Sequence, residues 1–221
     1  VGIISALCNS ESVIFSDEYN HASIIDGARL SKARIVVYKH NDMQDLEAKI
    51  LATPCSRGLI VSDAVFSMDG DIVDLPALVA LSKKYHLLTM IDEAHATGVI
   101  GKTGHGTVEH FGNIVRPDIL MGTLSKALGA EGGYACASKV IIEYLKNKAR
   151  SFIFATSQNP ATLAAALRAT EVLEEEPQRA QMLQHNVKFF LNALHAEGVE
   201  AYSPTAIIPI IIGDEKSALQ V

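Results

Sequence analysis

The sequence lacks the features that mark several large classes of protein. Basic residues are not in excess, since 19 lysines and arginines face 25 aspartates and glutamates, and the net charge is −6. No basic cluster interrupts this balance, which argues against a nucleic-acid surface. The longest apolar runs, such as residues 207–212, are too short to span a bilayer. We therefore expect neither nucleic acid nor membrane among the partners.

Cysteine is also scarce. Cys8, Cys55 and Cys136 are scattered, odd in number and without metal-type spacing. This pattern predicts a reducing compartment, taken here as the cytoplasm, with no disulfide framework and no metal site. No secretory signal is visible, but the chain begins at Val1, so the true N-terminus is expected to be absent and targeting is left open.

What the sequence does have is a regular alternation of strand and helix patterns. Hydrophobic residues make up 48% of 221, enough for one large domain or one domain plus part of another, and there is no internal repeat. Near-continuous apolar strands alternating with helices predict an α/β fold, a mostly parallel sheet covered by helices on both faces. The strands are expected at residues 13–16, 35–38, 59–62, 87–91, 117–121 and 134–137, and the helices at residues 1–8, 22–32, 42–52 and 75–85.

The alternation ends near residue 161. Two helices are expected at residues 161–175 and 177–197, then a strand at 206–212 and a new helix at the end, near Val221. We predict a large domain over residues 1–175, with its N-terminal part missing. The beginning of a smaller, truncated α+β domain is predicted over residues 176–221.

The most informative stretch is residues 122–133, where one lysine stands among hydroxyls and glycines between two strand-like runs. The glycines let the backbone turn tightly and approach something bulky. We interpret Lys126 as a desolvated amine that attacks an aldehyde to form a Schiff base. The alternative is an ordinary surface lysine on a short turn.

Acidic residues and Lys126 follow the ends of neighbouring predicted strands. Ligands of such sheets lie beyond the carboxyl ends of the strands, so Asp63, Asp92 and the Lys126 loop should converge on one rim. Lysine at one strand end and aspartate at the next suit pyridoxal phosphate, because the lysine holds the aldehyde and the aspartate keeps the pyridine nitrogen protonated. His95 can face the same ligand. Alternatively, Asp92 caps the next turn and His95 is an ordinary loop histidine.

Three further residues are weaker candidates. His21 offers a flat face for a ring, although a structural role is equally open. Ser67 and Thr123 are small donors suited to phosphate or phenolic oxygens, but such residues often only satisfy turns.

Residues 96–103 also fit a relaxed nucleotide-binding loop, which would make the protein a nucleotide hydrolase. Such a loop should follow a strand directly and open a helix. Here the acidic segment 92–95 occupies the strand end, and Gly104 and Gly106 would spoil the helix. We therefore favour a pyridoxal-phosphate enzyme over a nucleotide hydrolase and over an interaction module without cofactor.

Four segments together resemble the α-oxoamine synthases, pyridoxal-phosphate enzymes of the aspartate-aminotransferase fold (fold type I). The segments are residues 20–23, 65–70, 92–98 and 122–127. The resemblance implies that Lys126 holds the cofactor and moves protons at Cα. It also implies that Asp92 pairs with the pyridine nitrogen, His95 with the phenolic oxygen, and that His21 stacks on the ring. Ser67 would contact the cofactor and Thr123 its phosphate.

The resemblance also implies a reaction and an assembly. The motifs are most similar to the branch that condenses L-alanine with pimeloyl-CoA, or a pimeloyl carrier protein, to 8-amino-7-oxononanoate in biotin biosynthesis. Glycine C-acetyltransferase, which typically has glycine where Ser125 stands, or another α-oxoamine synthase is the alternative. The substrates implied are an amino acid and an acyl-CoA thioester. Family members are homodimers with shared active sites, in which Thr156 would reach the partner subunit's phosphate.

Two departures from the family pattern concern length. Members are nearly twice as long as this chain. The absent N-terminal part would carry further contacts, and the absent C-terminal part an arginine that holds the amino acid's carboxylate.

Overall fold

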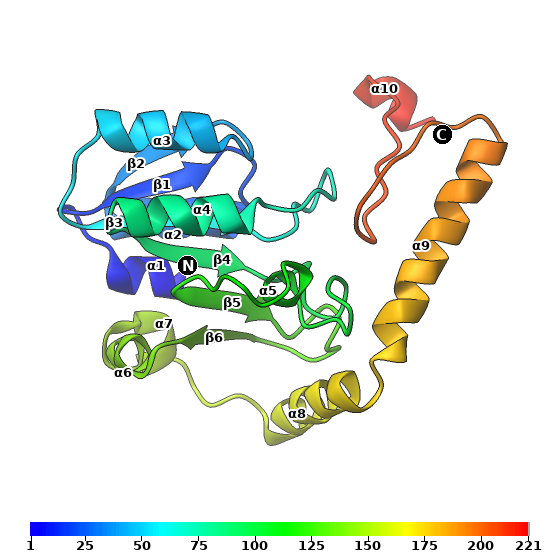
Figure 1. Cartoon of the computed structure of the whole chain (residues 1–221). Coiled ribbons are helices and arrows are strands. Elements are labelled where there is room, and N and C mark those ends of the chain that lie inside the picture. Colours follow the sequence, from blue (N-terminus) through cyan, green and yellow to red (C-terminus); the bar gives the residue numbers. More distant parts are fainter. Residues whose placement is uncertain (221) are drawn as a thin grey trace.

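The computed structural model describes residues 1–220 of the chain (Figure 1). Within them, six strands form one sheet in the order β2-β1-β3-β4-β5-β6. The strands are β1 Val13–Asp17, β2 Arg34–Tyr38, β3 Gly58–Asp63, β4 Leu88–Asp92, β5 Ile119–Thr123 and β6 Gly133–Ala137. Each coincides with a predicted strand to within two residues at either end.

The helices α1 to α4, α8 and α9 match their predictions to within one residue, whereas α6 and the short α5 and α7 have no predicted range. Local signals explain the good agreement: Asp42, for example, caps α3 by accepting the backbone N–H groups of Gln44 and Asp45. The helices are α1 Gly2–Leu7, α2 Ala22–Ser31, α3 Met43–Ala52, α4 Leu75–Lys84, α5 Thr107–His110, α6 Lys139–Lys148, α7 Arg150–Ile153, α8 Pro160–Glu175, α9 Gln178–Ala196 and α10 Glu215–Ala218.

The sheet is parallel from β2 to β5, and β6 runs antiparallel to β5. The chain places β2 on one side of β1 and then β3 on the other, so β1 and β3 flank a topological switch point. At such a point the connections leave in opposite directions and open a crevice beyond the strands' carboxyl ends. The predicted α/β architecture, a mostly parallel sheet, is confirmed.

Both faces of the sheet are covered, because successive strand residues point to opposite sides. On β1, Phe15 packs into a core with α3 and α4, whereas Ile14 packs into a second core with α1 and α2. On β4, Ile91 packs into the first core and Met90 into the second. These two apolar layers hold the strand ends, and hence the site, in fixed register.

The C-terminal part differs from its prediction in one respect. Residues 206–212 form no strand, because a strand requires a neighbour to complete its hydrogen-bond ladder and no described strand pairs with this segment. The segment instead follows an anchor on the loop between β3 and α4, where Thr205 Oγ1 donates a 2.7 Å hydrogen bond to the carbonyl of Gly70. The final helix α10 ends at Ala218, and Val221 lies outside the described residues.

Figure 1 shows α8 and α9 continuing away from the sheet, with the C-terminal segment returning toward it. The predicted boundary between residues 175 and 176 falls at the end of α8 and stays a prediction. Among residues 1–220, no helix has the length and apolar character that a membrane crossing requires.

Candidate active site

Six of the seven predicted site residues line one cavity of about 210 Å³. The cavity lies at the carboxyl ends of β3, β4 and β5, because the parallel register brings those ends to a common rim. The predicted residues that line it are His21, Ser67, Asp92, His95, Thr123 and Lys126. Asp63 and Ser23 line it as well.

Asp92 is the last residue of β4 and is only 4% exposed. Its Oδ1 accepts a 2.9 Å hydrogen bond from the backbone N–H of Ala94, while Oδ2 has no partner among the described residues. Burial raises the pKa of Asp92, and the positive charges of Lys126 and His21 oppose that rise. The free oxygen is thus available to a cationic or N–H-bearing group in the cavity.

Lys126 lies on a turn rather than a strand, in the loop between β5 and β6. The prediction of a desolvated amine is wrong for this chain, because the residue is exposed. The loop is internally braced: Thr123 Oγ1 lies 2.7 Å from Ser125 Oγ and donates to the carbonyl of Gly132 at 3.2 Å. Thr123 therefore shapes the loop that carries the lysine, besides facing the cavity.

The loop after β4 lies directly against the Lys126 loop. Gly98 has φ +79°, and a Cβ at this position would lie 2.5 Å from the Cβ of Ala127. Only glycine allows both this backbone conformation and so close an approach. The glycine thus sets the distance between the segment of Asp92 and the segment of Lys126.

His95 is half-buried beside the lysine. Burial lowers its pKa, and the charges of Lys126 and His21 lower it further, so the neutral imidazole is favoured. A neutral ring can both donate and accept a hydrogen bond. Ser67 is exposed and lines the cavity from the loop that follows β3.

His21 caps the N-terminus of α2, where its Nδ1 accepts the backbone N–H of Ser23 at 3.2 Å. Its own backbone N–H donates a 2.7 Å hydrogen bond to Asp63 Oδ2. The imidazole is exposed, so the main chain rather than packing around the ring places it at the cavity.

Thr156 lies apart from the cavity, in the exposed segment between α7 and α8. Nearby, Phe152 is 65% and Phe154 71% exposed, and the guanidinium of Arg150 lies 4.8 Å from the Phe154 ring. Both aromatic rings are thus largely exposed in this chain rather than packed over the sheet.

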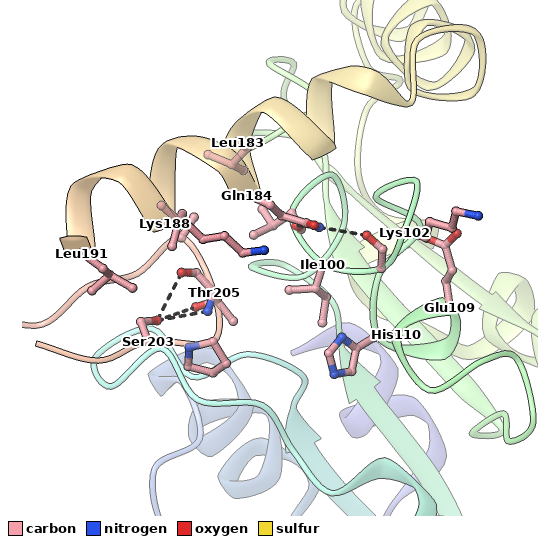
Figure 2. Close-up of a pocket in the computed structure, with 15 residues that line it drawn as sticks. Ile100, Lys102, Glu109, His110, Leu183, Gln184, Lys188, Leu191, Ser203 and Thr205 are labelled. Atoms are coloured by element: carbon pink, nitrogen blue, oxygen red, sulfur yellow. Dashed lines mark hydrogen bonds between the residues drawn. The ribbon is translucent and has the colours of Figure 1, made fainter. Parts of the chain in front are cut away.

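A larger cavity, of about 400 Å³, lies elsewhere, between the loop after β4 and α9 (Figure 2). Gln184 of α9 donates to the carbonyl of Gly101 at 3.0 Å and holds the two parts together. Residues 99–102 of the relaxed nucleotide-loop pattern line it, but they form turns, and the helix that follows, α5, has four residues. Without a helix N-terminus of useful length, this geometry gives no support to nucleotide binding.

The sequence predicts Asp63 at this rim but indicates no role for it. It gives no role to Asn20 or Ser23 either. Asn20 is buried, and its side chain spans two strands. The only available signal was their position in residues 20–23, next to a histidine already singled out. Among the described residues no cluster of three or more metal-type ligands occurs.

The sheet order and a lysine-bearing cavity at its carboxyl edge define the large domain of a fold-type I transferase, the fold of pyridoxal-phosphate-dependent enzymes. The chain belongs to the aminotransferase class I and II family, whose model matches residues 1–221.

Individual relatives agree with this assignment. The chain is 48% identical over 220 residues to 8-amino-7-oxononanoate synthase of Thermosipho melanesiensis, covering 99% of this chain and 56% of the relative. It is 49% identical over 221 residues to 8-amino-7-oxononanoate synthase 1 of Bacillus subtilis (strain 168), with coverages of 99% and 56%. A serine palmitoyltransferase variant from S. paucimobilis, solved with bound PLP and myriocin, superimposes with a TM-score of 0.92 at 30% identity, covering 98% of this chain and 57% of that one. The chain thus spans slightly more than half the length of these relatives.

Proposed function

We propose that the protein is a pyridoxal-phosphate-dependent C-acyltransferase of the α-oxoamine synthase type. Its substrates would be L-alanine and a pimeloyl thioester, either pimeloyl-CoA or a pimeloyl carrier protein. The new bond joins Cα of alanine to the acyl carbon, while alanine's carboxyl group leaves as CO2 and the thiol of coenzyme A or the carrier is released. The product is 8-amino-7-oxononanoate.

One observation carries the proposal: Asp92 and His95 from one sequence segment and Lys126 from another line the same cavity. This donor set fits pyridoxal phosphate. A primary amine suits its aldehyde, the free Oδ2 of the buried Asp92 suits its ring nitrogen, and hydroxyls on two loops suit its phosphate and phenolic oxygens. The relatives' names and the PLP-bound neighbour support the same conclusion.

The cofactor, when bound, supplies a protonated ring that draws electrons from Cα of the amino acid. Asp92 would hold the proton on the ring nitrogen. Lys126 would hold the aldehyde carbon and then carry a proton to and from Cα. His95 would bind the phenolic oxygen, and His21 would cover one face of the ring. Ser67 would contact the cofactor, Thr123 would bind its phosphate, and Thr156 would bind that of the partner subunit.

Glycine C-acetyltransferase is the alternative within the same chemistry, as is another α-oxoamine synthase. Ser125, which hydrogen bonds Thr123, stands where glycine C-acetyltransferases typically have glycine, and this favours the alanine-using branch. The homodimer, the cytoplasmic location and the two-domain division stay predictions.

The deciding experiment assays the intact protein, loaded with pyridoxal phosphate, against alanine, glycine and serine, each with pimeloyl, acetyl and palmitoyl thioesters. We expect CO2 release and free thiol only with alanine and the pimeloyl thioester. A preference for glycine with acetyl-CoA would replace the proposal by its alternative. A protein with no absorbance band from bound cofactor would contradict both.

A further inference from the structure

Asp63 is a buried carboxylate in the cavity to which the proposed chemistry assigns nothing. It ends β3, is 5% exposed, and lines the cavity beside Asp92. A carboxylate removed from water is destabilising unless it is engaged by partners. Its engaged partner is the backbone N–H of His21, at 2.7 Å from Oδ2, which is a short, charge-assisted hydrogen bond.

A second hydrogen bond joins the segment after β1 to the end of β3, this time between the backbone of Asp63 and the side chain of Asn20. Its Oδ1 accepts the backbone N–H of Asp63 at 2.9 Å, and its Nδ2 donates to Val61 O and to Ser16 Oγ, both at 2.9 Å. The side chain of Asn20 thus holds the backbone of Asp63, and the side chain of Asp63 holds the backbone of His21. This reciprocal pair joins β1 to β3 at the topological switch point.

The anchor matters because little else fixes His21. Its ring is exposed, and its described contact is local, through Nδ1 to Ser23. The position of the ring therefore depends on the path of the main chain after β1, and the Asp63 carboxylate fixes that path at His21.

We propose that Asp63 is a positioning residue, which acts through the backbone of His21 to hold the imidazole over the cofactor; this rests on the proposed function. Burial raises the pKa of Asp63 to about 7; the charges of Asp92 and Asp17 add to the rise, while the His21 hydrogen bond and the charge of Lys126 oppose it. Asp63→Asn keeps a carbonyl acceptor for the His21 N–H, whereas Asp63→Ala removes it.

The test measures the Kd of pyridoxal phosphate by absorbance for wild type, His21→Ala, Asp63→Ala and the double variant of the intact protein. We expect each single variant to bind about tenfold more weakly, and the double variant no more weakly than either. Asp63→Asn should recover most of the loss. Asp26→Ala, which removes one exposed charge from α2 without touching His21, is the matched control and should bind as wild type.

A second measurement needs no cofactor: amide hydrogen exchange of His21 should be faster in Asp63→Ala than in wild type. If the alanine variant does not fold, Asp63→Ser replaces it, since its hydroxyl is too short to reach the His21 N–H. Additive losses, unchanged binding in either single variant, or unchanged exchange at His21 would overturn the positioning role. A wild type that binds no pyridoxal phosphate would overturn the proposed function alone, because the exchange measurement still decides the anchor.

Discussion

Asp63 and Asp92 are register partners at the carboxyl ends of the neighbouring parallel strands β3 and β4. Both are buried, and burial raises the pKa of each, with the charge of Asp92 raising that of Asp63 further. Two buried carboxylates side by side favour a cationic ligand, and Lys126 lines the same cavity. One carboxylate is engaged by the His21 backbone and the other keeps an oxygen free. The pair therefore separates into an anchor and a ligand-binding group.

Lys126→Ala should abolish covalent attachment of the cofactor and lower turnover by about 10²–10⁴-fold or more, while the fold stays intact. Treatment with borohydride followed by peptide mapping measures the attachment, and circular dichroism checks the fold. Lys102→Ala, in the loop after β4, is the matched control and should keep both attachment and turnover. Full turnover in Lys126→Ala would refute the assignment.

Asp92→Asn should slow removal of the amino acid's Cα proton by about 10²–10³-fold, because the amide cannot stabilise a protonated ring nitrogen as a carboxylate does. The amide still accepts the Ala94 N–H, so the β4 turn should persist. Exchange of the Cα proton with deuterated solvent, followed by NMR, provides the rate. An unchanged rate would mean that Asp92 is only a turn residue.

Gly98→Ala should lower the free energy of unfolding by about 1–3 kcal/mol and weaken cofactor binding, since its Cβ would press on Ala127 beside the lysine. Gly112→Ala is a matched control. Gly112 also has positive φ, at +69°, but nothing lies within 4 Å of its added Cβ. The control should be destabilised by backbone strain yet bind cofactor normally. Equal cofactor affinity in both variants would show that the Gly98 contact does not position Lys126.

His40 should make stability depend on pH. Its Nδ1 lies 3.0 Å from Asp17 and its Nε2 2.9 Å from Asp71, with Tyr19 stacked on the ring; Glu18 accepts its backbone N–H. Burial alone would lower its pKa, but the hydrogen bonds and charges of the two aspartates outweigh it and the pKa is raised.

A raised pKa means that the folded state binds the proton more tightly. The stabilisation is therefore complete below the unfolded pKa of about 6.5 and disappears as pH rises through the folded pKa. We expect His40→Gln to lower thermal stability by about 1–3 kcal/mol near pH 6 and by less near pH 9. A difference that is constant across this range would show that the imidazolium does not stabilise the fold.

Thr156 should act on the partner subunit if the active sites are shared. Intact Lys126→Ala and Thr156→Ala proteins, mixed so that subunits exchange, would form heterodimers with one doubly defective site and one wild-type site. Activity should then rise above that of both parents, toward about half of the wild-type value per heterodimer. No rise, despite confirmed exchange and impaired parents, would place Thr156 in its own subunit's site.

The strands, the main helices and the strand-end residues could be predicted because their signals are local. Apolar runs of strand length, the cap at Asp42 and the glycines around Lys126 each express backbone preferences over a few residues. The parallel-sheet rule then places Asp92 and Lys126 on one rim without further information.

Only the tertiary structure decided the rest, because it depends on what lies beside a segment. Residues 206–212 have the composition of a strand, but no strand among residues 1–220 pairs with them. The glycines and strand-like runs around Lys126 predict a desolvated amine, yet the residue is exposed. The link between Asp63 and His21 joins residues 42 positions apart, and no local pattern encodes it. The sequence determines the chemical type of each side chain, whereas its burial and its hydrogen-bond partners depend on contacts between distant segments.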